Sequence, residues 1–217
     1  MSKRKVFQFL EDLSRNNSKE WMDKNRSRYE EVKSILVEEF DPILERLKEF
    51  DPRIVQPTAR KCLSRINNNL MFHPDRPTYK DHMGLAFGYG KGLADFYVHL
   101  GVSEQLIAGG LWHPSSEKLK LLRQEIDYEG ERLDTLLKRP EFADHFIIYE
   151  EDMLKGTPKG YSSDHDHIYL LRMKSLAAYR PITREDFYSE AFSDMVVESY
   201  KAVVPLLDFA NTAIQEA

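Results

Sequence analysis

The sequence is poor in cysteine, since Cys62 is the only one among 217 residues. A lone cysteine forms no internal disulfide and no Cys-x-x-Cys site, which is typical of proteins from a reducing compartment. Lys61 precedes it and could favour a reactive thiolate. A single cysteine followed by an apolar residue, here Leu63, is more often a small buried side chain, and we favour that interpretation.

The sequence also lacks a long apolar run. Stretches such as residues 202–207 fall far short of the roughly 18 residues that a membrane-spanning helix needs. The basic residues near the start are followed by Glu11 and Asp12 rather than by the apolar core of a secretory signal. We therefore expect a cytoplasmic protein with no membrane partner.

Negative charge exceeds positive charge overall, but two segments carry a local excess of positive charge. The net charge is −5 at pH 7, which argues against nucleic-acid binding because duplex-binding proteins are usually basic. Residues 60–91, however, contain six basic and two acidic side chains, and residues 155–180 contain five basic and two acidic side chains. Such segments either coat the rim of a sheet or hold an anion.

Standard nucleotide and hydrolase motifs are missing. The glycines of residues 88–92 resemble a phosphate loop, but Leu93 stands where a dinucleotide fingerprint needs glycine. No Walker A or Gly-x-Ser-x-Gly pattern is present. On an extended segment His165 and His167 would face the same side and could reach a metal ion. The sequence places no further ligand beside them, so we expect no bound metal and no cofactor.

Apolar residues at steps of three and four predict helices at both ends of the chain, in residues 1–52 and 183–217. Asn17 is a predicted N-cap, with Glu20 three residues later. Asp41-Pro42 predicts the end of one helix and the start of the next.

Turn residues and alternating patterns predict a mainly β region in residues 55–112. In one of its strands, Tyr97 and His99 share the face opposite the apolar residues. Residues 113–180 mix both patterns, with predicted strands at 147–149 and 167–179.

The short connections between strands favour antiparallel pairing. The order of helices, strands and helices predicts an α+β protein. We expect residues 1–217 to form a single compact domain whose antiparallel sheet is covered by the N-terminal and C-terminal helices.

The two basic segments predict a pocket for an anionic small molecule, such as a phosphorylated one. The predicted ligand-binding residues are Arg65, Lys80, Lys159, Lys174, Tyr79 and Tyr161. His165 is the best general acid or base, because histidine changes charge near neutral pH. No nucleophile can be assigned, so an enzymatic role stays open. The alternative is a non-enzymatic interaction or structural protein that binds a protein partner through a helical face.

Several stretches of the chain resemble a bacterial and fungal family known as domain of unknown function 2461. The matching pieces are Phe9 to Leu13 with Asn16 to Trp21, Arg65 to Phe72 with Asp75, Tyr79 and Lys80, Gly109 to Pro114, and Pro158 to Ser175. The resemblance implies an α+β domain of this length and no particular activity. Members commonly carry an Asp and an Arg where Asn69 and Met71 stand here. If those two residues are catalytic in the family, this chain has lost or altered the activity.

Overall fold

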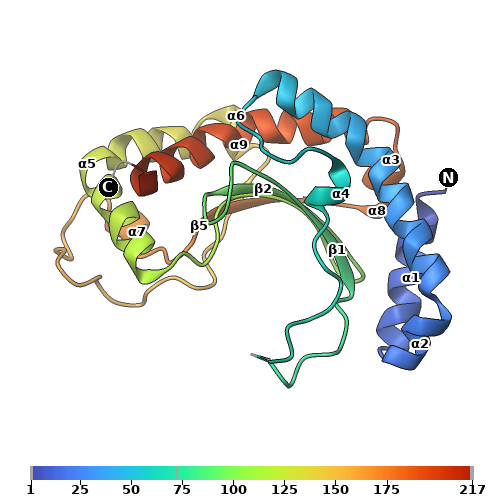
Figure 1. The fold of residues 1–217 in the computed structure, drawn as a ribbon. Helices are drawn as coiled ribbons and strands as arrows, with labels where there is room; N and C mark the ends of the chain where they lie inside the picture. Colours follow the sequence, from blue (N-terminus) through green and yellow to red (C-terminus); the bar gives the residue numbers. More distant parts are fainter. Residues whose placement is uncertain (1, 72, 216–217) are drawn as a thin grey trace. The chain divides into compact units, whose positions relative to one another are not determined.

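The computed structural model describes residues 2–71 and 73–215 (Figure 1). Phe72, which belongs to one of the family-like segments, lies outside the described residues. The helices are α1 (Arg4–Arg15), α2 (Lys19–Lys24), α3 (Arg26–Phe50), α4 (Ala59–Cys62), α5 (Ser116–Leu137), α6 (Pro140–Ala143), α7 (Ile168–Leu171), α8 (Arg184–Tyr188) and α9 (Phe192–Gln215).

The strands form one sheet in the order β1-β2-β3-β5-β4. Their bounds are β1 (His82–Gly88), β2 (Asp95–Gly101), β3 (Gln105–Leu111), β4 (Ile147–Ile148) and β5 (Leu176–Ile182). The sheet is antiparallel and the fold is α+β, as the sequence predicted.

Residue contacts divide the chain into two compact units. The first comprises Met1–Phe87, Tyr97–Ile107 and Pro181–Val197, and the second comprises Gly88–Phe96, Ala108–Arg180 and Glu198–Ala217. The single domain expected over residues 1–217 stays a prediction.

Helices α1, α2 and α3 pack against one another in the first unit (Figure 1). The Phe9 ring lies 5.8 Å from the rings of both Trp21 and Tyr29, measured between centroids. Farther along α3, Phe40 lies 6.0 Å from Phe87 of β1 and 5.7 Å from Phe192 at the start of α9. These aromatic contacts join the helices to one face of the sheet.

The second unit packs α9 against strands β2 and β3. The Tyr200 ring lies 5.0 Å from Phe96 in an edge-to-face contact. Gly109 lets α9 approach β3 closely, because a Cβ there would lie 2.7 Å from the Val203 side chain. Helical residues therefore bury one face of the sheet in this unit as well.

The predicted helix break at Asp41-Pro42 is wrong, because α3 runs without interruption through Pro42. Proline lacks the N–H that would complete a helical hydrogen bond. The apolar stripe nevertheless continues past it, and Phe40, Ile43 and Leu44 are fully buried. Asp41 instead accepts a 2.7 Å hydrogen bond from the Ala59 N–H at the start of α4. Packing of these buried residues therefore outweighs the tendency of Pro42 to interrupt the helix.

Two smaller predictions also need correction. Residues 167–179 are not one strand, since the helical turn α7 precedes β5. A short apolar run does not separate helix from strand by periodicity alone. The N-cap of α2 is Ser18, whose side chain accepts the Trp21 N–H, and not Asn17.

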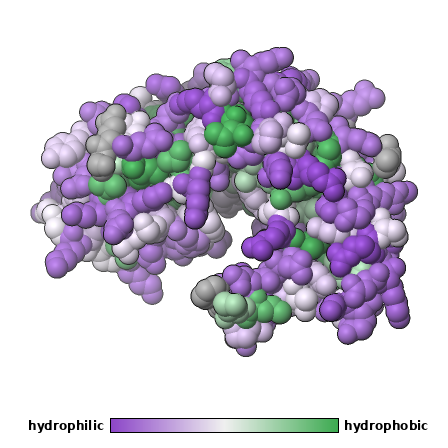
Figure 2. All heavy atoms as spheres, in the orientation of Figure 1, coloured by the Kyte–Doolittle hydropathy of each residue, from purple (hydrophilic) through white to green (hydrophobic). Residues whose placement is uncertain are grey.

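One face of the molecule is mainly polar (Figure 2). Hydrophilic side chains cover most of the face drawn in Figure 2. In the part of the chain that the structure describes, every helix is too short or too polar to cross a membrane.

Candidate functional site

A short antiparallel pairing within the first unit brings Arg65 and Lys80 together. Asn67 forms an isolated bridge with Tyr79, and the Lys80 N–H donates a 2.7 Å hydrogen bond to the Ile66 carbonyl. The segment from Arg65 to Lys80 is therefore a loop closed at its base, between α4 and β1 (Figure 1). Residues 15 positions apart in the sequence become neighbours in this way.

The side chain of Asn17 holds the base of this loop. Its Oδ1 accepts the Tyr79 N–H and its Nδ2 donates to the Tyr79 carbonyl, both at 2.9 Å. The Tyr79 ring is only 4% exposed, so it anchors the loop in the core of the unit. Lys80, the next residue, is thereby fixed at the point where β1 begins.

Arg65, Arg76 and Lys80 form a group of like charges that we call the basic cluster. Partial burial lowers the pKa of Lys80, and the positive charges of Arg65 and Arg76 lower it further. Among the described residues no carboxylate forms an ion pair with any of the three. The three cations therefore have no direct ion-pair partner in that part of the chain, although Asp75 and Asp81 are their neighbours in the sequence.

Next to the basic cluster lies a group of half-buried polar rings, His82, Tyr97 and His99, which we call the imidazole face. Tyr97 and His99 alternate with buried apolar residues along β2, and His82 is the first residue of β1. The rings of His82 and His99 lie 4.2 Å apart, and the Tyr97 hydroxyl lies 3.4 Å from Nδ1 of His99. The sheet thus presents three hydrogen-bonding side chains on the face away from its apolar core.

Burial keeps the imidazole face neutral. Desolvation, followed by the charge of His82, lowers the pKa of His99 to about 4. Desolvation also lowers the pKa of His82, against the effect of the Asp81 carboxylate 3.3 Å away. The pKa of Tyr97 is raised to about 12, again chiefly by desolvation. At neutral pH these groups can donate and accept hydrogen bonds without adding charge.

The sequence did not single out His82, Tyr97 and His99 as residues of a site. The alternation of β2 did assign Tyr97 and His99 to one polar face, which was the available signal. Tyr97 and His99 lie near His82 because β1 pairs with β2. The sequence of a single strand does not predict this pairing.

The other predicted residues lie in the second unit. The side chains of Lys159 and Lys174 are exposed, and the described carboxylates form no ion pair with them. The Tyr161 ring lies 6.2 Å from the His165 ring. The prediction that Lys159, Lys174 and Tyr161 hold the same anion as Arg65 and Lys80 stays a prediction.

Both ring nitrogens of His165 have partners inside the second unit. Nδ1 accepts the His167 N–H at 2.9 Å, so the proton lies on Nε2, which is 2.8 Å from Oδ1 of Asp127. These bonds hold the loop before α7 against α5. The role of His165 as a general acid or base stays a prediction.

Neither a metal site nor a reactive thiol is visible in the described residues. Within residues 2–71 and 73–215, no group of three or more His, Cys, Asp or Glu is arranged to hold a metal ion. Cys62 is 3% exposed, and burial raises the pKa of its thiol to about 12. The thiol therefore stays protonated at neutral pH.

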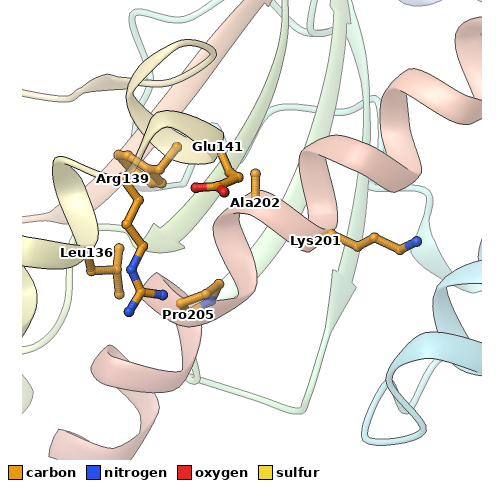
Figure 3. Close-up of a pocket in the computed structure, with 7 residues that line it drawn as sticks. Leu136, Arg139, Glu141, Lys201, Ala202 and Pro205 are labelled. Atoms are coloured by element: carbon orange, nitrogen blue, oxygen red, sulfur yellow. The ribbon is translucent and has the colours of Figure 1, made fainter.

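A groove of about 460 Å³ lies in the second unit, between α9 and the end of α5 with the following α6. Figure 3 shows Arg139 and Leu136 beside Pro205, with the Lys201 side chain extending away from the other labelled residues. None of the residues predicted from the sequence lines this groove. Volume alone therefore does not single it out as the site.

The comparison with protein families matches residues 5–209 to a model described as "Conserved hypothetical protein (DUF2461)". No curated protein and no solved structure matches the chain. The family match extends over nearly the whole chain and confirms the resemblance seen in the sequence, although its description names no activity. The chain belongs to the DUF2461 family of conserved hypothetical proteins.

Proposed function

We propose that the protein binds an anionic small molecule that carries a phosphate or carboxylate group, and that the basic cluster holds this group. The observation that carries the proposal is the proximity of Arg65, Arg76 and Lys80 without a carboxylate partner among the described residues. Two unit charges 4 Å apart repel by about 1 kcal/mol in water, and by more where water is excluded. A bound anion would replace this repulsion with attraction.

The side-chain types suit such a ligand. Each guanidinium group can donate two parallel hydrogen bonds to a phosphate or carboxylate, and Lys80 adds a compact charge. The neutral imidazole face supplies groups for the remainder of the ligand, such as hydroxyl or ester oxygens. Because His99 is neutral at physiological pH, its ring can both donate and accept a hydrogen bond there without adding charge.

The direct test is calorimetric titration of the protein with inorganic phosphate, glycerol phosphate and succinate at constant ionic strength. We expect at least one of them to bind saturably. Arg65→Met and Arg76→Met should each weaken binding about 10- to 100-fold, since a charged hydrogen bond contributes roughly 1.5–3 kcal/mol.

Lys120→Met is the matched control, because Lys120 is an exposed cation on α5, outside the basic cluster. It removes the same charge and should leave the affinity unchanged. Equal weakening by Arg65→Met and Lys120→Met would show that only net charge matters. That result, or the absence of saturable binding at millimolar ligand, would contradict the proposal.

A further inference from the structure

Two aromatic rings meet at the end of the sheet in the second unit. Trp112 directly follows β3, and Tyr149 directly follows β4. Their ring centroids lie 4.5 Å apart, with the planes inclined at 59°. The Trp112 side chain remains 55% exposed although it contacts a second ring. We call this pair the aromatic corner.

The intervening strand β5 makes this contact geometrically feasible. The Tyr149 N–H donates a 2.9 Å hydrogen bond to the Ala177 carbonyl of β5. On the other side, Gly110 of β3 lies so close to β5 that a Cβ would come within 2.3 Å of the Leu176 carbonyl oxygen. The small side chain of Ala177 and the absent one of Gly110 allow the two rings to meet across β5.

A buried network fixes the backbone beside Trp112. His113 has a φ of 43°, and no other described residue except glycine has a positive φ. Its N–H donates to Oγ of the fully buried Ser175, whose hydroxyl donates in turn to Oδ2 of Asp152, both at 3.1 Å. A strained residue of this kind persists only where the surrounding structure holds it, and such residues cluster at functional sites.

The electrostatic surroundings of the corner are negative. Desolvation raises the pKa of Tyr149, and the charges of Glu151 and Asp152 raise it further, with no basic side chain of the described part of the chain acting against them. Oδ1 of Asp152 is buried and has no hydrogen-bond partner in residues 2–71 and 73–215. Among the described residues, His113 is the one basic group within ion-pair distance of this carboxylate, with its Nδ1 3.6 Å from Oδ2.

We propose that the aromatic corner binds an alkylammonium group of a small molecule, with Trp112 and Tyr149 as its walls and Glu151 and Asp152 as its counter-charges. The negative faces of aromatic rings attract organic cations, and Trp is the strongest of them. An exposed Trp beside carboxylates gives an ammonium group both π attraction and charge neutralisation. The site shares no residue with the basic cluster and takes a ligand group of opposite charge.

Tryptophan fluorescence can test this directly, because the chain has only two Trp residues. The Trp21→Phe variant leaves Trp112 as the sole indole. We titrate this variant with choline, and separately with its uncharged isostere 3,3-dimethylbutan-1-ol, at mildly alkaline pH and constant ionic strength. Choline should change the emission saturably, and the alcohol should bind about tenfold more weakly or not at all.

Further variants in the same background identify the walls and the charges. Tyr149→Leu and Glu151→Gln should each weaken choline binding several-fold, up to about tenfold. The matched controls are Tyr128→Leu, at a Tyr that is 83% exposed, and Asp144→Asn, at an exposed carboxylate; both should bind choline as before. Circular dichroism verifies folding, and Glu151 is exposed, so its variant remains informative if Tyr149→Leu fails to fold.

Equal responses to choline and the alcohol would overturn the proposal, as would an emission change that does not saturate. So would unchanged choline affinity in folded Glu151→Gln. None of these outcomes bears on anion binding by Arg65 and Arg76, which is measured with other ligands.

Discussion

Glycine shapes the polar face of the sheet by making room for the residue opposite. Gly84 of β1 lies against Tyr97 of β2, and a Cβ at position 84 would come within 2.1 Å of the Tyr97 hydroxyl. Tyr97 therefore occupies space that any other residue at position 84 would need. The geometry of the imidazole face depends on this absent side chain.

Gly84→Ala should accordingly destabilise the protein by about 1–3 kcal/mol, because adding a methyl group to a filled space forces side chains and backbone to shift. Urea denaturation measures the change in the free energy of unfolding. Gly156→Ala is the matched control, since nothing lies within 4 Å of the Cβ it would add. A cost for Gly84→Ala no larger than that of Gly156→Ala would contradict this account of the sheet face.

Among the structural elements, the turn between α1 and α2 has a role that its local sequence does not predict. Asn17 was expected to cap α2, but Ser18 caps it. The Asn17 side chain is thereby available for both backbone hydrogen bonds to Tyr79, 62 residues away in the sequence. A side chain that satisfies two backbone groups in this way acts like an extra strand pairing.

Asn17→Ala should cost about 1–3 kcal/mol of stability, because it leaves two partly buried backbone groups without partners. It should also accelerate hydrogen exchange at the Tyr79 and Lys80 amides, which the loop base protects. Asn16→Ala is the natural comparison, since Asn16 makes one exposed side-chain bond to the Asp12 carbonyl, and its loss should cost little. If exchange at Tyr79 is equal in the two variants, Asn17 does not hold the loop.

How far the sequence predicts these elements depends on where their stabilising contacts lie. Alternation along β2 placed Tyr97 and His99 correctly, because one face of the strand is buried and the side-chain period is two. Pro42 was misjudged because buried neighbours along α3 outweigh the loss of one hydrogen bond. Rules based on local sequence predict an element correctly where the backbone geometry of that element determines it, as in β2. They fail where packing of buried residues determines it, as at Pro42.

The same distinction applies to the candidate site. The excess of positive charge around Arg65 and Lys80 was visible in the sequence. Their proximity rests on the bridge between Asn67 and Tyr79, and the position of His82 beside His99 rests on strand pairing. The spacing of residues along the sequence does not determine these contacts. The types of residue in the candidate site could therefore be predicted, but not how they are arranged in space.

On the scale of the whole molecule, stability should respond to pH through two half-buried groups of opposite effect. The pKa of His99 is lowered from 6.5 to about 4 by desolvation, followed by the charge of His82. Between these pH values the unfolded chain holds a proton on this ring that the folded chain lacks. His99 therefore makes stability rise with pH through this window, and its favourable effect is complete above pH 6.5.

Asp95 acts in the other direction. Desolvation raises the pKa of its carboxyl group from 3.8 to about 6. Between these values the folded chain holds the proton that the unfolded chain has lost, so Asp95 makes stability fall as pH rises. Above pH 6 it is a desolvated charge whose Oδ1 lacks a hydrogen-bond partner among the described residues, which costs stability.

The two effects overlap and partly cancel in the wild-type protein, so single variants should separate them. Relative to wild type, the free energy of unfolding of Asp95→Asn should rise between pH 3.8 and about 6 and reach a gain of about 1 kcal/mol near neutral pH, after allowance for solvent screening. For His99→Gln, the free energy of unfolding relative to wild type should instead fall by roughly 2 kcal/mol as the pH rises from about 4 to 6.5. Urea denaturation across this pH range measures both curves. Difference curves that are flat, or that slope in the same direction, would show that these two groups do not control the pH dependence.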